Sequence, residues 1–175
     1  MAGPTQDSDP IAVVDLFSGP GGLSLGFQSA GLNVAVGVEL DSDAARTYKT
    51  NFPEAKILEQ SIQDVNAEDI LRFLDNLYPS RTRTIVVGGP PCQPFSVANR
   101  QRMGSNHPSA SAVEDYWRLL GEIKPDAFLF ENVVSFESMG EGSSFVSLIE
   151  AMKELGFSPS VANFHVTAPL CAFSA

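Results

Sequence analysis

One cysteine of this chain, Cys92, lies in a loop whose composition could support covalent chemistry. The loop reads Gly88-Gly89-Pro90-Pro91-Cys92-Gln93-Pro94-Phe95-Ser96. Its prolines restrict the backbone and remove amide donors, so they would hold a thiol on a stiff support with few hydrogen-bonding neighbours. A thiolate presented in this way is suited to act as a nucleophile. The competing interpretation is a small buried core cysteine, because most free cysteines are buried.

A carboxylate follows another apolar run, Phe128-Leu129-Phe130, and is the second candidate for chemistry. Burying Glu131 there without a partner or a task would be costly. We expect Glu131 to lie buried beside Cys92 if their two strands are neighbours, with a raised pKa that lets it protonate or hydrogen-bond a ring nitrogen. The alternative is that Glu131 caps a turn together with Asn132.

A glycine-rich turn, Phe17-Ser18-Gly19-Pro20-Gly21-Gly22, connects the first apolar run to a helical pattern. Small residues at such a strand-to-helix turn let the backbone approach a nucleotide, although a tight structural turn has the same composition. Glu39 ends the next apolar run, where a carboxylate accepts hydrogen bonds from ribose hydroxyls in nucleotide-binding α/β proteins. Asp41 is a competitor for that role.

The hydrophobic pattern predicts the elements that position these residues. We expect strands over 11–16, 34–39, 56–58, 84–87 and 127–130, alternating with helices over 22–30, 42–51, 67–77, 113–123 and 143–155. Gly31 should stop the first helix. Such alternation with short connections predicts an α/β fold, a three-layer parallel sheet with helices on both faces.

Composition narrows the class of protein. A chain of 175 residues is the size of one domain, and its two cysteines form no disulfide framework. Without a leader pattern or a long apolar run, we expect a cytoplasmic protein that does not enter a membrane, and no metal site is predicted. Residues 1–10 should form a flexible tail.

The charge pattern points in two directions. The net charge of −10 argues against a polyanionic partner, but the stretch 76–113 contains four arginines, Arg81, Arg83, Arg100 and Arg102, and no Asp or Glu. That stretch predicts an anion-binding face near Cys92, or is an accidental gap in the acidic residues. Within it, residues 99–111 are expected to form a loop, which either merely connects or closes over the site.

Taken together, three motifs resemble those of the DNA (cytosine-5)-methyltransferases, and they occur in that family's order. They are Asp15-Leu-Phe-Ser-Gly-Pro-Gly-Gly-Leu-Ser-Leu-Gly-Phe27, Gly89-Pro-Pro-Cys-Gln-Pro-Phe-Ser96 and Glu131-Asn-Val133. The resemblance implies a Rossmann-like methyltransferase fold that binds S-adenosylmethionine. By resemblance, the cofactor-binding residues are Phe17, Ser18, Gly19, Gly21, Gly22, Leu23, Glu39, Leu40, Ser61, Ile62 and Pro90. The family often has an Asp where this chain has Ser61, before Ile62, so the contact to the adenine amino group differs here.

The implied activity is methyl transfer to C5 of a cytosine flipped out of double-stranded DNA, as in a restriction-modification system. Cys92 would add as a thiolate to C6 of the ring, Glu131 would protonate or hydrogen-bond N3, and loss of the C5 proton would release the thiol. The segment 99–111 would be the closing loop.

The resemblance covers the part before the family's target-recognition region. We expect 11–165 to form an incomplete catalytic domain, and 166–175 to be a tail unlike the family. The chain alone should therefore have little or no activity. Three alternatives stay open: a transfer RNA cytosine methyltransferase, a non-catalytic or split fragment that needs a complementary chain with the missing region, and a generic nucleotide-binding oxidoreductase.

Overall fold

The computed structural model describes residues 11–79, 83–91, 108–133 and 143–163. Within these ranges the chain forms a five-stranded sheet in the order β3-β2-β1-β4-β5, and every neighbouring pair is parallel. The strands are β1 (Ile11–Leu16), β2 (Asn33–Glu39), β3 (Lys56–Glu59), β4 (Arg83–Gly88) and β5 (Ala127–Phe130). All five predicted strands are confirmed, with ends shifted by no more than one residue.

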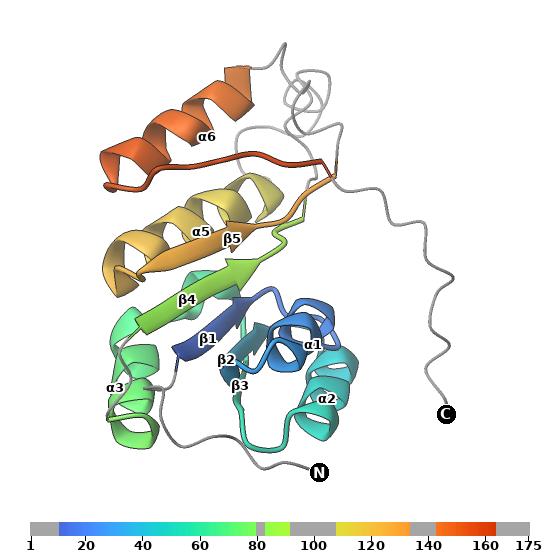
Figure 1. Cartoon of the computed structure of the whole chain (residues 1–175). Coiled ribbons are helices and arrows are strands. Elements are labelled where there is room, and N and C mark those ends of the chain that lie inside the picture. Colours follow the sequence, from blue (N-terminus) through green and yellow to red (C-terminus); the bar gives the residue numbers. More distant parts are fainter. Residues whose placement is uncertain (1–10, 80–82, 92–107, 134–142, 164–175) are drawn as a thin grey trace.

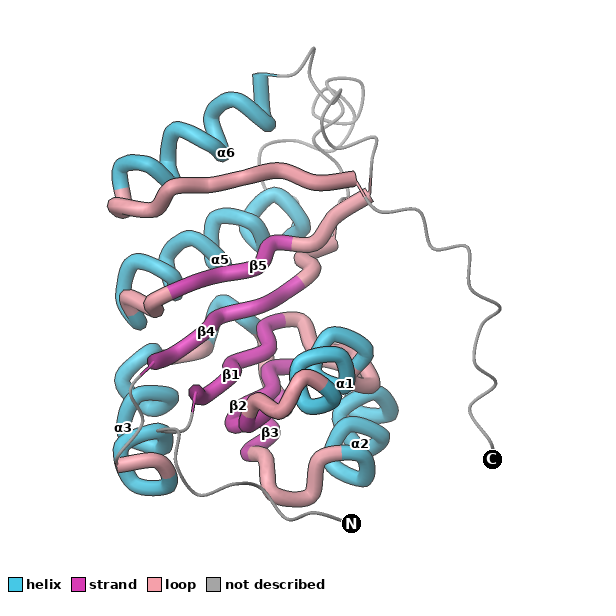
Figure 2. Tube along the Cα trace, in the orientation of Figure 1, coloured by secondary structure: helices cyan, strands magenta, loops and turns pink. Residues whose placement is uncertain are grey.

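Helices cover both faces of the sheet. They are α1 (Gly22–Ser29), α2 (Ser42–Asn51), α3 (Ala67–Leu77), α5 (Pro108–Ile123) and α6 (Ser143–Glu154), with a short 3₁₀ helix η1 (Ile62–Asp64). Figure 1 shows α1 and α2 on one side of the strands and α3 and α5 on the other. The tube in Figure 2 follows the same alternation of strand and helix. The predicted three-layer α/β fold is confirmed.

The core explains why apolar runs form these strands. β1 is central, and five of its six residues are buried because helices cover both of its faces. On one face Leu74 of α3 and Leu119 of α5 pack into the main core cluster, and on the other face Tyr48 and Phe52 of α2 pack against Val34. Burial on both faces therefore selects continuous apolar strands over alternating ones.

Local signals set most helix ends. The side chain of Asp41 accepts a hydrogen bond from Ala44 N (2.8 Å) and so caps α2. Gly31 follows α1 with φ +87°, which confirms it as the stop. Gly156, with φ +88°, ends α6 in a Schellman arrangement, since its N–H reaches Lys153 O and the next N–H reaches Met152 O.

The start of α5 corrects one prediction. The loop expected over 99–111 ends earlier, because residues 108–111 already belong to α5. Pro108 lies within the predicted loop, yet the fixed φ of proline suits the first position of a helix, where no N–H partner is needed. The rest of that loop, 99–107, lies outside the described residues, as do the predicted tails 1–10 and 166–175.

The strand order places the site. β1 and β4 lie side by side. The chain continues from β1 to β2 on one side of this pair and from β4 to β5 on the other side. The crevice beyond the carboxyl ends of β1 and β4 is therefore the topological switch point, where such sheets bind ligands. The turn after β1, Glu39 of β2, the loop after β4 and Glu131 after β5 all lie at this edge. None of the described helices is both long and apolar enough to cross a membrane.

Candidate cofactor and active site

The turn after β1 has an unusual backbone. Phe17 has φ +62°, a left-handed conformation that is strained for a residue with a side chain, and Gly19 and Gly21 have φ +53° and +102°. Ser18 N donates to Val38 O at 3.0 Å, which fastens the turn to β2. A side chain at Gly21 would collide with the ring of Phe52, so glycine is needed there for space as well as for conformation.

Glu39 closes this turn through its carboxylate. Its Oε2 accepts a hydrogen bond from Gly19 N (2.8 Å), and its Oε1 accepts one from Asp41 N (2.7 Å). A carboxylate has about four acceptor positions, so two bonds orient the group and leave capacity for hydroxyl donors. The Asp41 side chain is instead occupied in capping α2. Of the two carboxylates, Glu39 is the one that belongs to the lining of the neighbouring cavity.

Beneath the turn lies a buried network that the sequence reasoning missed. Ser24 Oγ donates to Asp15 Oδ2 at 2.6 Å and lies 2.9 Å from the hydroxyl of Tyr48. Burial raises the pKa of Asp15 to about 6, against the lowering effect of its hydrogen bonds to Ser24. Burial likewise raises the pKa of Tyr48. The network joins β1, α1 and α2 directly under the glycine turn.

A cavity of about 390 Å³ opens beside Glu39. Five of the predicted cofactor residues line it: Phe17, Glu39, Leu40, Ser61 and Ile62. Its remaining lining comes from Val38, Gln60, Gln63, Pro91 and Ala112. The cavity therefore gathers residues from the turn after β1, the end of β2, η1, the loop after β4 and α5.

The η1 turn forms one wall of this cavity. Ser61 Oγ accepts a long hydrogen bond from Gln63 N (3.4 Å), and Gln60 N donates to Glu39 O (3.1 Å). Serine thus stands at the position where an adenine contact was predicted, and its hydroxyl already caps η1.

Of the other predicted cofactor residues, Ser18 is buried, Gly22 and Leu23 begin α1, and Pro90 is buried beside the cavity-lining Pro91.

These residues fit the adenosyl part of S-adenosylmethionine. Asp15 Oδ1 and Ser18 Oγ are buried polar atoms that have no hydrogen-bond partner within the described part of the chain. Both residues flank the cavity-lining Phe17 along the chain, but neither of them lines the cavity itself. The cavity volume lies in the range of small-molecule sites, and Phe17, Leu40 and Ile62 give it apolar walls.

The loop after β4 approaches Glu131. Backbone pairing continues past the last strand residues, since Glu131 N donates to Gly88 O at 2.9 Å. A side chain at Gly89 would place its Cβ 2.6 Å from Glu131 Oε2, so glycine leaves room for the carboxylate against the loop. The expectation that the fourth and fifth strands are neighbours is confirmed. Cys92 itself lies outside the described residues, as does the rest of its loop to Ser96.

The expectation that Glu131 is buried is wrong: its side chain is exposed. Glu131 stands one residue beyond the last paired position of β5, and β5 is an edge strand, so part of its surface faces solvent. The local turn is held by its neighbour, because Asn132 Oδ1 accepts from Val133 N (2.8 Å) and Asn132 Nδ2 donates to Pro90 O (3.3 Å). Asn132 thereby ties the loop of Cys92 to the end of β5.

The predicted basic face is corrected in part. Arg83 is the first residue of β4, so it lies at the opposite end of the strand from Gly88 and contributes no charge near the cysteine loop. Arg81, Arg100 and Arg102 lie outside the described residues. Among the described residues, Arg118 on α5 does reach the cavity wall, and the sequence does not predict this because nothing near Arg118 shows that it contacts η1.

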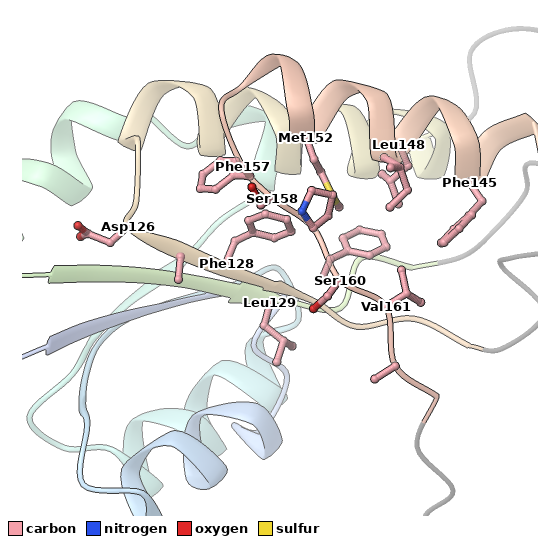
Figure 3. Close-up of a pocket in the computed structure, with 15 residues that line it drawn as sticks. Asp126, Phe128, Leu129, Phe145, Leu148, Met152, Phe157, Ser158, Ser160 and Val161 are labelled. Atoms are coloured by element: carbon pink, nitrogen blue, oxygen red, sulfur yellow. The ribbon is translucent and has the colours of Figure 1, made fainter.

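A second hollow, of about 470 Å³, lies beside β5 and is lined by none of the predicted site residues. Its walls are β5, α6 and the segment 157–162, and Figure 3 shows Phe128, Leu148, Met152 and Phe157 around it. The hollow is thus a gap at the sheet edge, on the far side of β5 from β4.

Comparisons with known proteins agree with the motifs. The family model for the C-5 cytosine-specific DNA methylase matches residues 11–167. The chain is 32% identical over 148 residues to the Type II methyltransferase M1.HphI of Haemophilus parahaemolyticus, covering 84% of this chain and 39% of that protein.

Solved structures extend this likeness to the fold. A DNA modification methyltransferase encoded within a prophage (E. coli) superimposes with a TM-score of 0.62 at 33% identity, over 82% of this chain and 37% of that one. Spodoptera frugiperda DNMT2 superimposes with a TM-score of 0.61 at 27% identity, over 82% of this chain and 41% of that one. The chain thus spans about two fifths of the length of these proteins. It belongs to the C-5 cytosine-specific DNA methylase family.

Proposed function

We propose that this chain is the cofactor-binding and nucleophile-bearing part of a DNA (cytosine-5)-methyltransferase that uses S-adenosylmethionine. The observation that carries the proposal is the carboxylate of Glu39, held by Gly19 N and Asp41 N at the mouth of a 390 Å³ cavity. S-Adenosylmethionine, when bound, supplies an electrophilic methyl group. In this proposal Glu39 accepts the ribose hydroxyls, and Leu40, Ser61 and Ile62 surround the base.

The chemistry proposed for the substrate follows the family resemblance. Cys92, the residue after the cavity-lining Pro91, adds as a thiolate to C6 of a flipped-out cytosine. Glu131 hydrogen-bonds or protonates N3, which stabilises the negative charge that the addition places in the ring. C5 then takes the methyl group, and loss of the C5 proton breaks the bond to C6 and releases the thiol. The exposed position of Glu131 beside Gly89 supports this role, because a carboxylate must be reachable to touch a substrate base.

The substrate is proposed to be double-stranded DNA and the setting a restriction-modification system in the cytoplasm, because curated relatives such as M1.HphI are Type II methyltransferases. RNA is the competing substrate. Competition between DNA and RNA duplexes for the same adduct distinguishes the two.

The decisive experiment is covalent trapping on DNA that contains 5-fluorocytosine, with S-adenosylmethionine present. Fluorine at C5 cannot leave as a proton does, so the thiol stays attached to the ring. Little or no adduct is expected from the chain alone; with a complementary target-recognition region supplied, the adduct should form with the native sequence and be lost in Cys92→Ser. An adduct that persists in Cys92→Ser would remove Cys92 from the role of nucleophile.

A second candidate is a part that works only with a complementary polypeptide carrying the target-recognition region. The share of the relatives that the chain covers favours it, since the chain spans 39% of M1.HphI and 37% of the prophage methyltransferase. In this candidate, residues 11–165 form the catalytic part and the adduct appears only on co-expression with the complementary segment. This candidate would be excluded if the chain alone formed the adduct at the same rate as the chain co-expressed with the complementary segment.

A further inference from the structure

Arg118 connects α5 to the wall of the cavity. From the middle of α5, Nη2 donates to Ile62 O (3.0 Å) and Nη1 donates to Val65 O (3.2 Å). These two carbonyls belong to η1 and the residue that ends it. The guanidinium is held from its own helix by Asp115 Oδ1 and Glu122 Oε2, each at 3.2 Å.

This arrangement suits arginine and no other cation. Its planar fork carries several N–H donors in fixed directions, so one side chain satisfies two carbonyls and two carboxylates together. A lysine ammonium offers the charge without that geometry. The side chain is only 33% exposed, so these bonds are partly shielded from water.

The contact acts on the same turn that lines the cavity. Ile62 is buried in the main core cluster, and it lines the cavity together with Gln60, Ser61 and Gln63. The helix that holds Arg118 also supplies Ala112 to the cavity lining. A shift of η1 relative to α5 would therefore change the cavity's width.

We propose that Arg118 is a positioning residue that sets the wall against which the adenine of the cofactor packs. The inference rests on the proposed function, in which this cavity takes the adenosyl group. Arg118 does not touch the ligand. It holds the carbonyl groups of Ile62 and Val65 and so fixes the position of the Ser61–Ile62 backbone relative to the adenine base.

The test compares Arg118→Gln and Arg118→Lys with a matched control on α3. Arg72 makes the same type of ion pair to an aspartate three residues earlier, Asp69 (3.2 Å), and its side chain is 68% exposed. Calorimetry measures the dissociation constants of S-adenosylhomocysteine and of its hypoxanthine analogue, S-inosylhomocysteine. Hydrogen exchange measures protection of the Asp64 and Val65 amides, which bond to Ser61 O and Ile62 O.

Arg118→Gln should weaken S-adenosylhomocysteine binding about tenfold, reduce the preference for adenine over hypoxanthine, and deprotect both amides. Arg118→Lys should fall between Arg118→Gln and the native chain, and Arg72→Gln should change none of the three readouts. Two outcomes would overturn the positioning role and leave the proposed function intact. In the first, the Arg118 variants lose the same affinity for S-adenosylhomocysteine as for S-inosylhomocysteine. In the second, the native chain binds and both Arg118 variants bind with unchanged affinity. No binding by the native chain would overturn both. If Arg118→Gln does not fold, Arg118→Lys carries the same comparison.

Discussion

Gly89 and Glu131 face each other so closely that one extra carbon would disturb them: a Cβ at Gly89 would lie 2.6 Å from Glu131 Oε2. Glu131 N is at the same time bonded to Gly88 O, so the backbone of the two segments is fixed while the carboxylate uses the free space. The glycine before the two prolines thus decides where the carboxylate stands.

Gly89→Ala should therefore move the Glu131 carboxylate with little effect on the fold. Because the end of a glutamate side chain is flexible, the free energy of unfolding should fall by less than about 1 kcal/mol, whereas 5-fluorocytosine trapping should slow at least tenfold. The double variant Gly89→Ala/Glu131→Gln is the control, since it should be no slower than Glu131→Gln. Fully additive losses would show that Gly89 acts through another group.

Glu39 and Asp41 can be separated by paired substitutions. Glu39→Gln should weaken S-adenosylhomocysteine binding about tenfold or more, because an amide offers a single acceptor oxygen to Gly19 N, Asp41 N and a ribose. Asp41→Asn should leave affinity and stability nearly unchanged, since asparagine also caps a helix. Calorimetry on both variants checks this, and the reverse order of affinities would assign the ribose to Asp41.

The stability of the chain should depend on pH through Asp15. Its pKa is about 6 in the folded protein against 3.8 for an unperturbed aspartate, so the folded state favours the protonated acid. That contribution is complete below about pH 4 and is lost as the pH rises through about 6, which costs roughly 3 kcal/mol at most. Asp15→Asn stays neutral throughout, so it should gain stability relative to the native chain between pH 4 and pH 7. Urea titrations measure the free energy of unfolding of both proteins. A difference between them that stays constant from pH 4 to pH 7 would refute the raised pKa of Asp15.

Gly37 lies under the ring of Tyr48, and a Cβ there would come 2.6 Å from two ring carbons of Tyr48. Gly37→Ala should lower the free energy of unfolding by about 1–3 kcal/mol, because the buried ring cannot move aside without losing Ser24. Gly26→Ala is the matched control, since α1 has open space there, and it should stabilise the chain by about 0.5–1 kcal/mol. Urea denaturation of both variants is the measurement. An equal change in the free energy of unfolding for the two variants would mean that Tyr48 is not tightly packed.

The amino-acid sequence by itself determined the strands and most helix ends, because burial on both faces demands continuous apolar runs such as 11–14 and because Asp41 and Gly31 act within one turn of the chain. It also placed Phe17, Glu39 and Glu131 at one edge of the sheet, since parallel strands share that edge.

Only the tertiary structure decided which side chains meet. Glu39 reaches Gly19 across 20 residues and Arg118 reaches Ile62 across 56, through contacts that no local pattern encodes. It also placed Glu131 in solvent, because β5 is the edge strand, and began α5 at Pro108. Local chemistry sets the conformation of a segment, whereas burial and pairing between distant segments depend on how the whole sheet assembles.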